Sequence, residues 1–206
     1  MDFRNTLRTV VPTLEADVLR VLAPADKAFT GRDIARRAEG VSHEGVRQAL
    51  ARLVRQGVVE SERAGNATLY RLNREHLAAP HIVALATLRQ RLIEELRIAI
   101  AAWTIQPIVA AVFGSVARGE ADASSDIDLL IVRNPSTGID DDDWREQVVA
   151  LDARASMWTG NDTRTLEYDT LEFEEAVRVD SAARDAVRDG IVVGGSWPWP
   201  VQPPES

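Results

Sequence analysis

The sequence predicts an α+β protein of two domains, and three observations carry that prediction. Up to residue 78, apolar residues recur at helical spacing and then in two strand-like runs. From residue 107 onward, continuous apolar runs typical of buried strands alternate with helical patterns. The charge divides in the same way, because residues 1–78 carry 13 Lys+Arg and 10 Asp+Glu, whereas residues 79–206 carry 11 and 22. Opposite charges indicate two domains with different tasks.

The composition narrows the class of protein. A chain of 206 residues, 45% hydrophobic and 27% charged, can build one large core or two small ones, which excludes a disordered or fibrous protein. Cysteine is absent, so disulfides and thiolate metal sites are excluded. Without a leader-like start or an apolar stretch long enough for a bilayer, we expect a cytoplasmic protein with no membrane partner. The formal net charge of -8 argues against a protein coated in nucleic acid.

Three helices and a hairpin are expected within residues 1–78. Thr30 followed by Asp33 forms a capping-box pattern at the start of the second helix, and Gly40 ends that helix. Ser42 is the expected N-cap of the third helix, which carries apolar residues on one face and polar residues on the other. A Gly-containing turn separates the two strand-like runs. The expected elements are helices over residues 14–22, 30–39 and 42–56 and strands over residues 58–63 and 68–73.

This order of elements resembles the winged helix-turn-helix domain of bacterial repressors over about residues 12–75. The resemblance implies that the helix over residues 42–56 enters the major groove of DNA and that the hairpin touches phosphates. The implied DNA-binding residues are Ser42, His43, Glu44, Arg47, Gln48, Arg52, Arg63, Asn66 and Arg71. Two other interpretations stay open: the polar residues form an ordinary solvated face, or the domain docks a protein partner.

Residues 79–104 form the expected linker between this first domain and the second. Apolar residues recur every three or four positions from Ile82 to Ile100, which predicts one long amphipathic helix. Such a helix packs domains together or forms the seam of a homodimer. A dimer would suit a winged helix, because paired reading heads bind two half-sites.

The second domain is expected over residues 105–195, as a mixed β-sheet flanked by helices. The apolar runs 108–113 and 127–132 predict buried strands that need helices on at least one face. Asp140 to Asp143 precede a helix and are most simply its cap, with a metal role as the alternative. Residues 163–169 alternate as a strand, and two short helices and a last short strand follow. The tail over residues 196–206, rich in proline and tryptophan, is expected to be extended and flexible.

Two short motifs of this domain carry the chemistry. Gly114 and Ser115 end a strand and open a helix, so backbone N–H groups and a hydroxyl face an anion, and Gly114 lets phosphate oxygens approach the main chain. Asp126 and Asp128 follow on the next strand, where a spacing of two places both carboxylates on one face. Neighbouring carboxylates repel each other unless a cation lies between them, and hard oxygen ligands favour Mg²⁺ or Mn²⁺.

The pattern Gly-Ser, ten residues and Asp-x-Asp resembles the nucleotidyltransferases of the DNA polymerase beta superfamily, specifically their small bacterial and archaeal members. The resemblance covers about residues 105–195. It implies transfer of a nucleoside monophosphate from a triphosphate, with ATP the expected substrate, to an acceptor hydroxyl or phosphate. It also implies that Gly114, Ser115 and Ser125 bind the nucleotide and that Asp126 and Asp128 ligate the metal.

Two further residues stay open within this resemblance. Arg118 neutralises the leaving pyrophosphate, or it only forms a salt bridge with a neighbouring carboxylate. The family also has a third carboxylate on a neighbouring strand, and Glu167, in the middle of the run 163–169, is the favoured candidate. Asp169 is the other candidate, unless it caps the following helix. If neither acid serves as the third carboxylate, the domain binds nucleotide but catalyses the transfer poorly.

Three functions remain on these grounds. The first is a metal-dependent nucleotidyltransferase coupled to a DNA-binding winged helix. The second is a transcriptional regulator whose transferase-like half senses nucleotide. The third is an antitoxin whose acceptor is a cognate toxin protein. Neither the acceptor nor the preferred triphosphate follows from the motifs.

Overall fold

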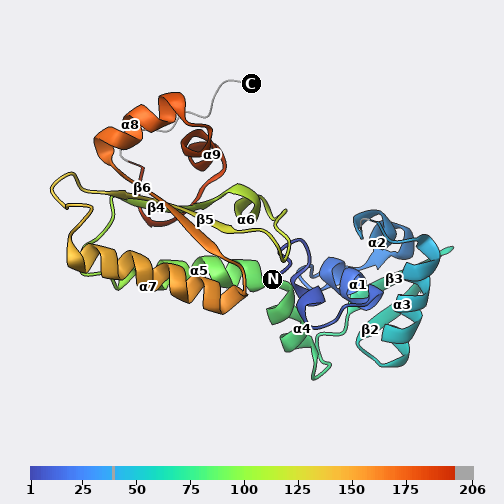
Figure 1. The fold of residues 1–206 in the computed structure, drawn as a ribbon. Coiled ribbons are helices and arrows are strands. Elements are labelled where there is room, and N and C mark those ends of the chain that lie inside the picture. Colours follow the sequence, from blue (N-terminus) through green and yellow to red (C-terminus); the bar gives the residue numbers. More distant parts are fainter. Residues whose placement is uncertain (39, 198–206) are drawn as a thin grey trace. The chain divides into compact units, whose positions relative to one another are not determined.

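The computed structural model of the protein describes residues 1–38 and 40–197, which divide into two compact units (Figure 1). One unit, here the N-terminal unit, contains Asp2 and residues 4–88. The other, here the C-terminal unit, starts at Arg89 and also includes Met1 and Phe3. Most of the predicted flexible tail, residues 198–206, lies outside the described residues.

The N-terminal unit contains the helices and the hairpin that the sequence predicted. As predicted, the Thr30 side chain caps one helix by accepting the Asp33 N–H at 3.1 Å, and Ser42 caps the next by accepting the Gly45 N–H at 3.1 Å. The strands form an antiparallel sheet in the order β1-β3-β2. The elements in chain order are η1 (Thr6–Thr9), α1 (Leu14–Leu22), β1 (Phe29–Thr30), α2 (Gly31–Arg37), α3 (His43–Arg55), β2 (Val59–Ala64), β3 (Ala67–Leu72) and α4 (Ala79–Ala86).

The predicted linker helix over residues 79–104 is two helices in the structure. α4 ends at Ala86 and α5 (Leu88–Ala101) begins after Thr87, whose φ of -111° and ψ of 17° leave the helical region. The Thr87 hydroxyl donates to the Val83 carbonyl at 2.9 Å, a bond that competes with helix propagation. The apolar repeat continues across the break because it serves two cores: Ile82 packs in the N-terminal core and Leu96 in the C-terminal core.

A four-stranded mixed sheet forms the centre of the C-terminal unit, in the order β6-β5-β4-β7 (Figure 1). β5 and β6 run parallel and the other neighbours antiparallel. Helices cover both faces, which confirms the predicted α+β class with a mixed sheet flanked by helices. The elements after α5 are β4 (Val109–Phe113), α6 (Gly114–Arg118), β5 (Ile127–Arg133), α7 (Asp142–Thr159), β6 (Thr163–Asp169), α8 (Thr170–Val179), α9 (Ser181–Asp189) and β7 (Ile191–Gly195).

The two faces of this sheet bury different cores. Odd-numbered residues of β5, such as Leu129, pack against apolar residues of α5 and α7, including Trp144 of α7. We call this side of the sheet the α7 face. Even-numbered residues, such as Leu130, pack with Phe173 and the rest of α8 and α9, and we call this side the α8 face. Because β5 and β6 pair in register, with Leu130 opposite Leu166, the same division continues along β6.

Two further observations complete the fold. Asp141 caps α7 by accepting the Trp144 N–H at 3.0 Å, as expected, and Asp142 and Asp143 lie in the first turn of that helix. Among the described residues, no helix combines the length and the apolar character needed to cross a membrane.

Candidate active site

The two motifs meet at the edge where β4 ends and β5 begins. Asp128 lies opposite Phe113 of β4 and opposite Arg164 of β6, which places it on the α8 face. Gly114 follows Phe113 with a φ of +66°, in the left-handed region. A Cβ at Gly114 would lie 2.5 Å from the Asp128 Oδ2, so only glycine allows this turn to approach the carboxylate. The structure therefore brings the Gly-Ser turn and the Asp-x-Asp motif together.

The charge of Asp128 lacks a direct partner. No described residue hydrogen-bonds to its carboxylate or forms an ion pair with it. Burial raises the pKa of Asp128, and the negative charge of Asp126 raises it further, while the positive charges of Arg164 and Arg118 lower it. Ionisation of Asp128 is therefore more costly than that of a solvent-exposed aspartate, and a cation bound beside it would favour the ionised form.

Asp126 has a partner that the sequence analysis missed. The Arg164 Nε lies 2.9 Å from the Asp126 Oδ2, with the arginine side chain 73% exposed and the aspartate side chain 27% exposed. Arg164 shares the parity of Leu166 and Tyr168 along β6, which pack on the α8 face. The alternation along β6 was the signal in the sequence that could have placed Arg164 near Asp126. It becomes informative only once the pairing of β6 with β5 is known.

The two serines of the predicted site differ. Ser115 is half-buried at the start of α6, and its hydroxyl has no hydrogen-bond partner among residues 1–38 and 40–197. The Ser125 hydroxyl accepts the Asp122 N–H at 2.9 Å and so closes the turn before Asp126. The Asn161 amide holds the same turn by donating to the Ser125 carbonyl at 2.8 Å. Ser125 thus shapes the loop, whereas Ser115 keeps a free donor.

Arg118 forms the salt bridges that were one of its two expected roles. Its Nε lies 2.8 Å from the Glu120 Oε2 and its Nη1 lies 3.5 Å from the Asp189 Oδ2. These carboxylates raise the pKa of the guanidinium further. Arg118 is still close enough for its charge to act on Asp128.

Glu167 does not join the pair, which corrects its assignment as the third carboxylate. It lies opposite Ile131 on the α7 face, where it accepts the Trp144 Nε1–H at 2.9 Å, while Asp128 lies on the α8 face. Its carboxylate is also 3.7 Å from Arg133, a side chain only 7% exposed. The predicted alternation along β6 was correct, but the register with β5 turns this acid to the other side of the sheet. Glu167 balances a buried arginine and supports Trp144.

The alternative acid, Asp169, caps α8. Its carboxylate accepts the N–H groups of Leu171 and Glu172 at 2.8 and 2.9 Å, and the Glu172 side chain bonds back to the Asp169 N–H. Across the described parts of the chain, no group of three or more His, Cys, Asp or Glu side chains is placed to hold a metal ion. The donor set of Asp126 and Asp128 fits one divalent cation with hard oxygen ligands, but it lacks the acid that a second would need.

The predicted DNA-binding residues of the N-terminal unit fall into two groups. On α3, the exposed Glu44 accepts hydrogen bonds from Arg47 and Gln48 at 2.6 to 2.9 Å, which lowers the pKa of Glu44 to about 2. Ser42 caps the helix, and His43 is exposed beside it. Arg52 is held away from this group by an ion pair with Glu15 of α1.

The predicted DNA-binding residues of the hairpin also differ in their partners. Arg63 and Asn66 are exposed at the tip, and Arg63 has no ion pair with the described residues. Arg71 is paired across the hairpin with Glu60 at 2.7 Å. Arg71 therefore belongs to the base of the hairpin, and its charge is already balanced.

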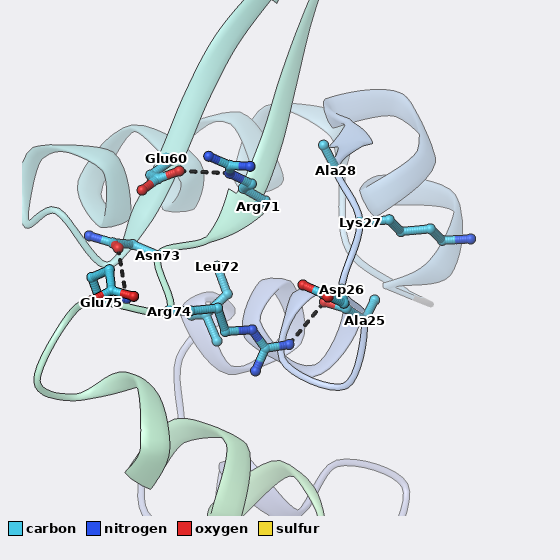
Figure 2. A pocket seen from close by; sticks show the side chains of 10 residues that line it. All are labelled: Ala25, Asp26, Lys27, Ala28, Glu60, Arg71, Leu72, Asn73, Arg74 and Glu75. Carbon is cyan, nitrogen blue, oxygen red and sulfur yellow. Dashed lines mark hydrogen bonds and ion pairs between the residues drawn. The ribbon is translucent and has the colours of Figure 1, made fainter.

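Arg71 lines a cavity of about 300 Å³ between residues 25–28 and the hairpin base (Figure 2). Arg74, on the same wall, donates to the carbonyls of Ala23 and Ala25 at 2.9 and 3.0 Å. Lys27 extends away from both arginines (Figure 2), with its Nζ 5.2 Å from the centre of the Phe29 ring. Protein oxygens thus engage both arginines of this cavity.

One family model matches a segment of the C-terminal unit. The family model described as the nucleotidyltransferase domain matches residues 93–193, from within α5 to within β7. No curated protein matches the chain. The matched segment contains the Gly114 turn, both aspartates and Arg164. Residues 93–193 are therefore similar to nucleotidyltransferase domains.

Proposed function

We propose that the C-terminal unit transfers a nucleoside monophosphate from a nucleoside triphosphate, expected to be ATP, to an acceptor hydroxyl or phosphate, with a divalent cation held by Asp126 and Asp128. One observation carries this proposal: the half-buried Asp128 has no direct partner among the described residues and lies against the Gly114 turn, within the segment that matches the nucleotidyltransferase family. A buried carboxylate without a partner is costly for a purely structural site.

In the transfer, the acceptor oxygen attacks the α-phosphorus, the bond to the bridging β-phosphate oxygen breaks, and pyrophosphate leaves while the acceptor proton passes to solvent. When bound, Mg²⁺ or Mn²⁺ supplies positive charge to the phosphate oxygens. Gly114 leaves space for the phosphates beside the main chain. The free Ser115 hydroxyl donates to a phosphate oxygen, and Arg118 adds positive charge toward the leaving group.

A second candidate function is nucleotide sensing by a regulator, with weak or no transfer. The α8 face favours it in one respect, because no third acid among the described residues joins Asp126 and Asp128 in a group that could hold a metal ion. The N-terminal unit would then be a winged helix-turn-helix that binds DNA. The order α1, β1, α2, α3, β2, β3, with the sheet order β1-β3-β2, supports that assignment.

Transfer of label from α-³²P-ATP separates these functions. The full chain is incubated with Mg²⁺ or Mn²⁺, its own promoter DNA and cell extract as sources of acceptor. Label transfer that disappears in the Asp126→Asn, Asp128→Asn double variant supports the transferase. Metal-dependent ATP binding without transfer supports the sensor. If wild type and double variant bind ATP equally, both candidates fail.

DNA binding has its own test in the hairpin. Arg63→Ala should weaken binding to promoter DNA and lower the salt dependence by about one phosphate contact. Arg71→Ala is the matched control, since its charge is balanced by Glu60. Fluorescence anisotropy over a salt series measures both. Equal affinities of wild type and Arg63→Ala for DNA at low salt would show that the hairpin tip does not contact DNA.

A further inference from the structure

The position on β6 that faces the aspartate pair holds a cation instead of an acid. Arg164 lies directly opposite Asp128 in the parallel register of β5 and β6 and points to the α8 face with it. We propose that Arg164 is the built-in second cation of this site: it occupies Asp126 in the free protein and moves to the nucleotide phosphates when a divalent cation binds. This inference rests on the proposed function.

The contacts of Arg164 leave room for both states. Its Nε lies 2.9 Å from the Asp126 Oδ2, and the side chain is 73% exposed. Among the described residues, Asp126 alone forms an ion pair with the Arg164 side chain. A guanidinium has five N–H donors in a planar fork, so most remain for phosphate oxygens. Its exposure allows the side chain to change rotamer without disturbing the core.

The charge of the site supports the same conclusion. Asp126, Asp128 and Arg164 together carry a single net negative charge, which one divalent cation reverses. The resulting positive site attracts a triphosphate. A third acid in place of Arg164 would require two cations for the same result. Arg164 thus explains how the site can bind a nucleotide with the donor set it has.

Opposite effects on two affinities distinguish this role from an ordinary surface ion pair. Removing Arg164 frees Asp126 for the divalent cation, so affinity for Mn²⁺ alone should rise. The same change removes a phosphate contact, so affinity for ATP should fall. A residue that only stabilises the fold would not move the two in opposite directions.

The experiment uses the full chain and two probes. Mn²⁺ binding without nucleotide is measured by electron paramagnetic resonance, and binding of a fluorescent ATP analogue is measured in Mn²⁺ and in EDTA. Arg164→Ala should bind Mn²⁺ about two- to fivefold more tightly, the range expected for release of an exposed ion pair. It should bind the ATP analogue about tenfold more weakly in Mn²⁺, whereas in EDTA, where no divalent cation displaces Arg164 from Asp126, its affinity for the analogue should stay close to that of wild type. Arg164→Lys should recover part of the ATP affinity.

Arg145→Ala is the matched control, because Arg145 is also exposed and paired with an aspartate, Asp140, at 3.3 Å on the same unit. The proposal is overturned if Arg164→Ala and Arg145→Ala have the same affinity for Mn²⁺, or the same affinity for the ATP analogue in Mn²⁺. In that case, loss of Mn²⁺-dependent ATP binding in Asp128→Asn would leave the proposed function standing. Retained binding in Asp128→Asn would overturn both.

Discussion

The carboxylates on the two faces of the central sheet differ in their partners. On the α7 face, Glu167 accepts from Trp144 and faces Arg133, and Asp152 accepts the Thr165 hydroxyl at 2.6 Å. On the α8 face, Asp128 has no direct partner in the part of the chain that the structure describes. The contrast teaches that residue type and strand position are not enough to recognise a catalytic acid. The partners around each carboxylate separate a structural acid from one that awaits a ligand.

The largest expected effect follows from Asp128→Asn. The change removes a ligand charge on the α8 face, so Mn²⁺-dependent affinity for ATP should fall by about a hundredfold or more. The melting temperature should not fall, because no described residue depends on this carboxylate for a bond. Isothermal titration calorimetry and thermal unfolding measure the two quantities. A variant that melts earlier and binds ATP normally would place Asp128 among the structural acids.

The opposite result is expected for Glu167→Gln on the α7 face. The amide oxygen can still accept from Trp144, but the charge that faces the buried Arg133 is lost. The free energy of unfolding should fall by about 2 kcal/mol, with Asp169 and Glu172 retaining part of the balance. Urea unfolding measures the loss. ATP affinity should stay at the wild-type value, and a marked decrease would return Glu167 to the active site.

Gly114→Ala tests the close approach between the turn and Asp128. The added Cβ would lie 2.5 Å from the Asp128 Oδ2, so the carboxylate must shift, and ATP affinity should fall by about tenfold. Gly160→Ala is the matched control, because Gly160 has a φ of +74° and nothing within 4 Å of such a Cβ. Both variants should lose about 1 kcal/mol of stability through backbone strain. Equal ATP affinities for both would show that the close approach is not needed.

The smallest effect concerns Asp152 on the α7 face. Burial raises the pKa of Asp152 above its ordinary value of 3.8, while its bond from Thr165 opposes the shift. The folded state therefore holds this proton more tightly than the unfolded state, so ionisation of Asp152 lowers stability as pH rises from 3.8 through the raised pKa. Asp152→Asn should raise the melting temperature slightly at pH 7.

This gain should vanish below the ordinary carboxyl pKa, where Asp152 is protonated in both states. Thermal unfolding of wild type and variant over a pH series measures it. A gain that is the same at every pH would show that ionisation of Asp152 is not its cause.

Local sequence was enough for much of this protein. The spacing of apolar residues, the caps Thr30 and Ser42, and the change of period after residue 107 predicted the helices, the hairpin and the strands. The separation of two between Asp126 and Asp128, and the glycine needed at position 114, are also local properties. These features depend on backbone geometry within a few residues, so a single segment contains them.

Tertiary structure alone decided the side of the sheet on which each residue of β6 lies, and where the linker divides. Alternation separated Glu167 from Leu166, but only the register with β5 turned Glu167 toward Trp144 and Arg164 toward Asp126. The repeat from Ile82 to Ile100 is continuous, yet two cores bury its two ends and the helix breaks at Thr87. Strand register and shared cores join segments far apart in the chain, and a local pattern does not contain that information.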